Sequence, residues 1–120
     1  MTRSCSGVSG VLVAGLLLAC GSAPRPEARM ASSEGAIRGA QEAGAQTVPS
    51  ATLYLKLAEE EREAALALVK DDKNHRAAYM LARSEADAEL AVALARAARA
   101  QAEAAKAAEQ VQDLKTKAGK

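Results

Sequence analysis

The sequence predicts an all-α protein, an antiparallel helical hairpin or small three-helix bundle with a long alanine-rich C-terminal helix. From about Ser33 onward the chain consists mostly of Ala, Glu, Arg, Lys, Leu and Gln, which are strong helix formers. No run of β-branched or aromatic residues alternates with polar ones as in strands, and aromatic residues make up only 2% of the chain. The few glycines and prolines beyond Ser33 divide this region (33–120) into three helical segments.

Residues 1–19 have the layout of a secretory signal peptide. The positively charged Arg3 precedes an apolar run from Val8 to Ala19, which is shorter than the roughly 20 residues needed to cross a bilayer. The run ends in "Leu17-Leu18-Ala19-Cys20", which resembles the lipobox of bacterial lipoproteins. In those proteins the cysteine thiol receives a diacylglycerol and becomes the new N-terminus. We therefore expect cleavage before Cys20 and lipidation of its thiol.

Two alternatives remain for this segment. Cleavage after Ala23 would release a soluble secreted protein, and an uncleaved segment would act as an N-terminal anchor. Cysteine usage favours lipidation: Cys5 lies in the part removed, so Cys20 has no partner for an internal disulfide. Lipoproteins retained in the inner membrane commonly carry aspartate after the cysteine, whereas this chain has Gly21. In a Gram-negative host we therefore expect an outer-membrane protein that faces the periplasm.

A flexible tether is predicted over residues 20–32. It contains Pro24, Pro26 and several small or charged residues, and it lacks the apolar periodicity of a helix. Such a segment would hold the folded part away from the membrane surface.

Three helices are predicted after the tether, at about 33–45, 49–70 and 73–117. Gly44 suits the end of the first helix, and Pro49 suits the first turn of the second. In the second helix an apolar stripe recurs at helical spacing and is interrupted by Glu60 and Glu61. These two residues belong to the run from Glu59 to Glu63, which is most simply a solvated acidic helix face. The stripe consists of Leu53, Leu57, Ala64 and Leu68.

The third helix is expected to begin after a short turn, with Asp72 or Asn74 as its N-cap. It contains no glycine or proline before Gly119, and at 1.5 Å per residue it would reach about 68 Å. The short turn makes the second and third helices antiparallel neighbours. Beyond Leu94, every apolar residue up to Gln110 is alanine. Alanine buries little apolar area, so we expect this part of the helix to gain little free energy from packing.

Two arrangements of the first helix are open. It folds back on the hairpin to give a three-helix bundle with an overhanging third helix, or it continues the second helix end to end along the third. The folded-back arrangement is favoured.

The segment from Ala36 to Ala97 resembles a bacterial family called domain of unknown function 4398. A "GA…P" break, an acidic turn and the pattern "A..LA..A.ADA.LA" carry the resemblance. The matching residues are Gly44, Ala45, Pro49, Leu55, Ala58, Asp72, Ala78, Ala82, Ala86, Asp87, Ala88, Leu90 and Ala91. The resemblance implies an envelope lipoprotein or periplasmic helical domain, in some cases with peptidoglycan-binding partners, and no established activity.

Enzymatic, metal-binding and nucleic-acid-binding classes are disfavoured by the sequence. His75 is the single histidine, it sits at a helix start, and few aromatic residues exist to build a pocket. The run from Asp71 to Asn74 lacks the glycine and distal glutamate of a calcium-binding EF-hand loop. Sixteen basic and 15 acidic residues give no basic excess for nucleic acid. We expect a non-enzymatic protein without cofactor or metal.

The C-terminal region suggests two kinds of partner. The alanine face between Ala91 and Ala108 is suited to close packing against another helix, including a second copy. Lys120 ends the chain, as a lysine ends the major outer-membrane lipoprotein of enteric bacteria, where it is joined to peptidoglycan. Three hypotheses follow: a lipid-anchored structural or adaptor protein of the envelope, a wall tether through Lys120, and a carrier or enzyme subunit that would require a binding cavity.

Overall fold

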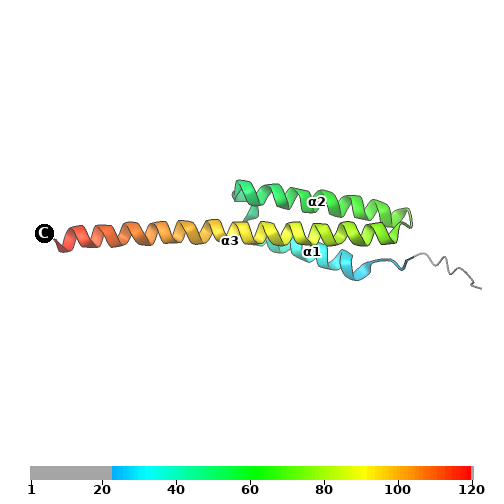
Figure 1. The fold of residues 1–120 in the computed structure, drawn as a ribbon, viewed down its shortest axis with the longest axis horizontal. Coiled ribbons are helices and arrows are strands. Elements are labelled where there is room, and N and C mark those ends of the chain that lie inside the picture. Colours follow the sequence, from blue (N-terminus) through cyan, green and yellow to red (C-terminus); the bar gives the residue numbers. More distant parts are fainter. Residues whose placement is uncertain (1–22, 120) are drawn as a thin grey trace, which may run out of the picture.

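The computed structural model describes residues 23–119 and forms a three-helix bundle from which one helix projects (Figure 1). Helix α1 spans Glu27–Glu42, a short 3₁₀ turn η1 spans Ala45–Thr47, α2 spans Pro49–Lys70 and α3 spans Asn74–Ala118. No strand occurs in this part of the chain. The all-α prediction is confirmed, as is the folded-back arrangement of the first helix.

Helix α3 is the centre of the bundle, and α1 and α2 pack along two sides of it (Figure 1). Helix α2 runs antiparallel to α3 because the turn between Lys70 and Asn74 is short. Helix α1 runs parallel to α3: Ala23, just before it, accepts a hydrogen bond from Asn74 Nδ2 (2.8 Å) at the start of α3. The end-to-end arrangement of the first two helices is therefore wrong.

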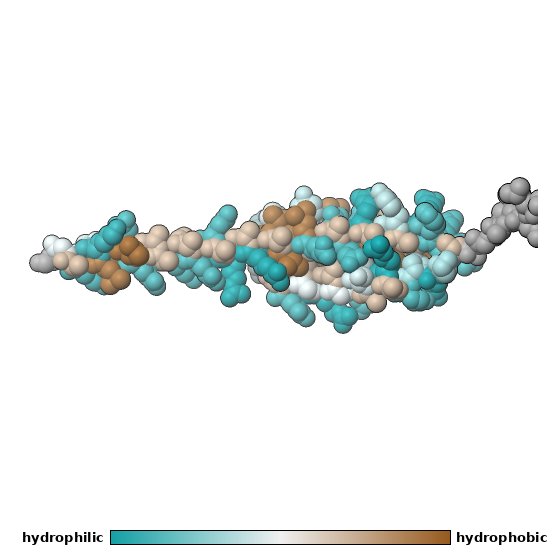
Figure 2. Space-filling model, turned by 60° about the horizontal axis from the view of Figure 1, so that its bottom comes forward, coloured by the Kyte–Doolittle hydropathy of each residue, from teal (hydrophilic) through white to brown (hydrophobic). Residues whose placement is uncertain are grey.

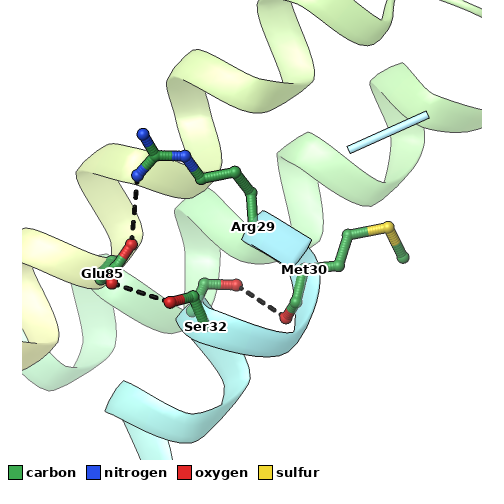
Figure 3. Close-up of polar contacts among 5 residues, drawn as sticks. Arg29, Met30, Ser32 and Glu85 are labelled. Carbon is green, nitrogen blue, oxygen red and sulfur yellow. Dashed lines mark hydrogen bonds and ion pairs between the residues drawn. The ribbon is translucent and has the colours of Figure 1, made fainter. Parts of the chain in front are cut away.

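The first helix begins earlier than the sequence suggested. Residues 27–32 were predicted to belong to the tether, but α1 starts at Glu27, directly after Pro26. A proline restricts the residue before it and blocks the interior of a helix, yet it leaves the following residues free to be helical. The residues that follow are good helix formers, and two of them contact α3. Arg29 Nη1 lies 3.4 Å and Ser32 Oγ 2.8 Å from the Glu85 carboxylate (Figure 3).

The break between α1 and α2 is formed by the residues that predicted it. Gly44 adopts a left-handed conformation with φ of 81°, which glycine reaches without a steric penalty. Pro49 occupies the first turn of α2, where its missing N–H costs no hydrogen bond. Thr52 Oγ1 donates to the carbonyl of Ala45 (2.9 Å) and joins the turn to α2.

The core of the bundle is built mainly from small side chains. Along α3 the buried residues recur at alternating spacings of three and four, the heptad pattern of a coiled coil. We call this row the buried seam; it consists of Asn74, Ala77, Leu81, Ser84, Ala88, Ala91 and Ala95. Because most of these side chains are small, the helices approach closely, and Ser84 Oγ donates to the α2 carbonyl of Ala58 (2.7 Å).

The predicted apolar stripe of α2 is wrong in its phase. Leu53 and Leu57 are 56% and 36% exposed. The residues of α2 that face the core are instead Ala51, Leu55, Ala58, Glu61, Ala65 and Val69, half of them alanines. The prediction followed the largest side chains, whereas close helix packing selects small ones.

The predicted N-cap of α3 is also wrong. Neither Asp72 nor Asn74 makes a side-chain capping hydrogen bond, and Lys73 precedes the helix as its capping residue. Asn74 points its amide at Ala23, so it ties α1 to the hairpin turn. Asp72 adopts a positive φ of 57° and forms the turn itself.

Candidate functional site

The long helix divides into two segments with different surroundings. Residues 74–98 are covered by α1 and α2, and we call them the covered segment. Every residue from Arg99 to Ala118 is exposed, and we call this part the overhang; at 1.5 Å per residue it extends about 30 Å past the bundle. Figure 1 shows the overhang as a single straight helix with no neighbouring element.

The overhang is helical for local reasons. It contains no glycine or proline, and alanine has the highest helix propensity. Two ion pairs at i,i+4 spacing support it: Arg99 Nε lies 3.0 Å from Glu103 Oε1, and Lys117 Nζ lies 2.6 Å from Asp113 Oδ2. The covered segment supplies the helix nucleus, so the overhang needs only to propagate it.

The predicted alanine face between Ala91 and Ala108 is split by the fold. Ala91 and Ala95 are buried against α1 and α2, so the bundle itself occupies that part. The alanines beyond Ala98 are exposed. The buried seam continues through Ala98 into the overhang at Ala102 and Ala105, and then becomes polar at Glu109, Gln112 and Thr116.

A second feature is an open groove between α2 and α3 beside the hairpin turn. Its volume is about 700 Å³. The lining residues are Ala64, Ala67, Leu68, Asp71, His75, Arg76, Tyr79 and Met80. His75 is solvent-exposed at the start of α3, as the sequence suggested. None of the lining side chains is a serine, threonine or cysteine, so the groove lacks a nucleophile that His75 would activate.

One titratable group lies inside the bundle. Glu61 of α2 was interpreted as part of a solvated acidic face, but it is only 7% exposed. Its Oε1 lies 2.6 Å from Arg83 Nη2 on α3. Burial raises the pKa of the Glu61 carboxyl; the Arg83 cation opposes this, and Asp87 adds to it. The Glu61–Arg83 ion pair joins α2 to α3. The second carboxylate oxygen of Glu61, Oε2, has no hydrogen-bond partner within residues 23–119.

Cys20 and Lys120, the predicted lipidation and wall-attachment residues, lie outside the described residues. Within residues 23–119, no group of His, Cys, Asp and Glu side chains is arranged to hold a metal ion. No helix of the same range has the length and hydropathy of a membrane-spanning segment.

Comparison with known proteins adds no identification. No protein-family model matches the sequence, and neither a curated protein nor a solved structure is significantly similar to it. The resemblance to domain of unknown function 4398 therefore stays a prediction from the residues alone.

Proposed function

We propose that this protein is a non-enzymatic lipoprotein, anchored in the membrane through Cys20, that presents a helical bundle in the periplasm. In this proposal the bundle is a structural or adaptor element of the cell envelope. The lipobox-like run before Cys20 supports the lipid anchor. The exposed overhang of α3 supports a surface for binding partners.

One geometric observation supports it most directly. Ala23 lies beside Asn74, at the end of the bundle where the hairpin turns. Three residues span at most about 10 Å, so a lipid on Cys20 would attach near that same end. Helix α3 has 45 residues and leads away from this end for about 67 Å. The overhang is then the part of the described chain farthest from the membrane.

The energetics of the anchor fit a permanent attachment. Each buried methylene of an acyl chain contributes about 0.8 kcal/mol, and a single chain binds only marginally. A lipoprotein cysteine carries two or three chains, so the protein would stay on the membrane. Such a role requires no binding cavity, because it depends only on the display of a helix.

Intact mass of the mature protein tests the anchor. The protein is extracted from the membrane fraction of its native host, beside a Cys20→Ser control. A mass that begins at Cys20 and carries two or three acyl chains, absent in the control, is the expected result. A chain that begins at Pro24 without lipid would make the protein a soluble exported bundle and overturn the proposal.

A second candidate function, a tether between the outer membrane and peptidoglycan through Lys120, is favoured by the direction of α3. A hairpin would shorten the reach of the chain if its last helix returned toward the anchor. Here α1 and α3 both lead away from the Ala23 end and only α2 returns, so α3 retains its full length as a spacer.

Muropeptide analysis tests the tether. Purified sacculi are digested with lysozyme and trypsin, and peptides containing Lys120 are sought by mass spectrometry. A tether predicts a muropeptide joined through the Lys120 amine that disappears in Lys120→Arg, whereas Lys117→Arg retains it. The absence of any such muropeptide from the wild type would exclude the tether and leave the adaptor role.

A further inference from the structure

The overhang carries an apolar row that the bundle does not use. It begins on the covered segment and lies on the side of α3 away from the buried seam. We call it the outer stripe; its members are Ala86, Leu90, Ala93, Ala97, Ala100, Ala104, Ala107, Val111, Leu114 and Ala118. Every one of them is exposed. Figure 2 shows apolar surface near the C-terminal end of α3, where Val111 and Leu114 lie 48% and 65% exposed.

The spacing of the outer stripe is that of a coiled coil. Its members alternate at intervals of four and three without interruption, which is the heptad repeat of a and d positions. The interval of three from Val111 to Leu114 makes Val111 an a position and Leu114 a d position. A β-branched residue at a with leucine at d favours a parallel two-stranded coiled coil.

The contrast with the buried seam shows that this pattern is more than an excess of alanine. In the overhang the seam positions become Glu109, Gln112 and Thr116. The outer stripe instead gains its largest side chains over the same turns, at Val111 and Leu114. No charged residue of the overhang falls on a stripe position, although Arg, Lys, Glu and Asp surround it.

We propose that the outer stripe binds a second copy of this chain, with the two α3 helices parallel and in register. This inference rests on the lipid anchoring proposed above: two chains held at Cys20 in one membrane have their α3 helices pointing in the same direction. Their outer stripes then meet at equal height, with Val111 against Val111 and Leu114 against Leu114 of the second copy.

The charges beside the stripe are compatible with this pairing. In a parallel dimer each g position faces the e position of the next heptad on the partner helix. These pairs are Glu89 with Leu94, Arg96 with Gln101, Glu103 with Ala108, and Gln110 with Lys115. None of them sets like charges opposite each other, so two identical helices meet without repulsion along the stripe.

The bundle leaves room for the second helix. The contacts of α3 with α1 and α2 come from the buried seam and its flanks, such as Glu85 with Arg29 and Arg83 with Glu61. The stripe lies on the remaining side, so each copy keeps its own bundle outside the dimer interface. Because most stripe residues are alanine, the contact between two stripes buries little area and is weak by itself. Confinement to one membrane raises the effective concentration of the two chains and so favours their pairing.

Cysteine cross-linking in membranes of the native host tests the dimer. In a parallel, in-register pair the two introduced thiols of Leu114→Cys lie together, and mild oxidation yields a covalent dimer on a non-reducing gel. Glu109→Cys is the control, since Glu109 is exposed in the same part of the overhang, about 7.5 Å along α3 from Leu114, but on the opposite side of the helix. We expect at least tenfold more dimer from Leu114→Cys than from Glu109→Cys.

Two outcomes would overturn the inference. Equal dimer from both variants means random collision, and no dimer from Leu114→Cys means that the stripe is unpaired or that the helices run antiparallel. A second pair of variants checks the interface itself. Val111→Glu added to Ala104→Cys abolishes the Ala104→Cys dimer while leaving helicity unchanged, since Val111 is solvated in the single chain; persistence of that dimer also contradicts the inference.

The same preparations separate this inference from the proposed function. Lipidated protein that forms no Leu114→Cys dimer refutes the dimer alone. A cross-linked dimer whose intact mass lacks acyl chains refutes the lipid anchor and leaves the pairing of the stripes standing.

Discussion

The covered segment and the overhang of α3 belong to one continuous helix and share an alanine-rich composition, yet they are stabilised in different ways. The covered segment buries its seam against α1 and α2, with Leu81 and Ala88 fully inaccessible to solvent. The overhang is exposed along its whole length and depends on helix propensity and i,i+4 ion pairs. Alanine therefore allows close packing in one segment and maintains a solvated helix in the other.

Removal of a large side chain should give the largest difference between the two segments. Leu81 is fully buried, so Leu81→Ala leaves a cavity and lowers the free energy of unfolding by about 2–5 kcal/mol. Leu114→Ala is the matched change in the overhang and stays within about 0.5 kcal/mol in dilute, monomeric protein. Urea unfolding followed by circular dichroism measures both; equal losses would mean that the overhang is packed.

Overfilling the seam should have the next largest effect. Ala88 is fully buried where the helices approach closely, so Ala88→Leu forces them apart at a cost of about 1–3 kcal/mol. Ala102 continues the same seam in the overhang, and Ala102→Leu changes the free energy of unfolding by less than about 0.5 kcal/mol. A stable Ala88→Leu variant would show that the bundle is looser than its seam indicates.

Loss of a hydroxyl distinguishes the segments by a smaller amount. Ser84 Oγ donates across the core to the carbonyl of Ala58, so Ser84→Ala costs about 0.5–1.5 kcal/mol. Thr116 Oγ1 bonds only within its own helix, to the carbonyl of Gln112. Thr116→Ala replaces threonine with a better helix former and is neutral or slightly stabilising. Equal losses in the free energy of unfolding for Ser84→Ala and Thr116→Ala would contradict this difference between the two segments.

The smallest effect concerns the pH dependence of the covered segment. Burial raises the folded-state pKa of Glu61 above its ordinary value of 4.5. The folded state then holds the proton more tightly than the unfolded state, so stability falls as the pH rises from 4.5 through the folded-state pKa. In Glu61→Gln this loss is absent, because glutamine does not titrate. Melting temperatures of both proteins at pH 4 and pH 7 should therefore show a steeper fall for the wild type.

A wild-type protein that gains stability relative to Glu61→Gln over that interval would contradict the assignment. It would mean that the Arg83 cation outweighs burial and lowers the pKa of Glu61.

The sequence predicted the helices and their breaks because those depend on local chemistry. Gly44 and Pro49 act through their own backbone conformations, and the composition of α3 is sufficient to keep it helical. The sequence also predicted that the packing of α3 weakens in its alanine-rich half, but it placed the change at Leu94, whereas Ala95 is still buried and continuous exposure begins at Arg99.

The errors in the prediction came from tertiary contacts. The start of α1 at Glu27 is stabilised by Glu85, distant in sequence, through Arg29 and Ser32. The seam of α2 was assigned to leucines because size was used as the criterion for burial, while the helices approach through alanines. Glu61 was interpreted as solvated because its partner Arg83 lies on another helix. The spacing of the outer stripe could have been read from the sequence, but only the fold shows that it is exposed.

Hydrogen–deuterium exchange along α3 tests the division of this helix most directly. In dilute protein we predict strong protection of backbone amides across residues 74–98 and a fall in protection from Arg99 toward Ala118, where no packing opposes fraying. A rise in protein concentration should increase protection in the overhang alone. Uniform protection along all of α3 at every concentration would contradict the account.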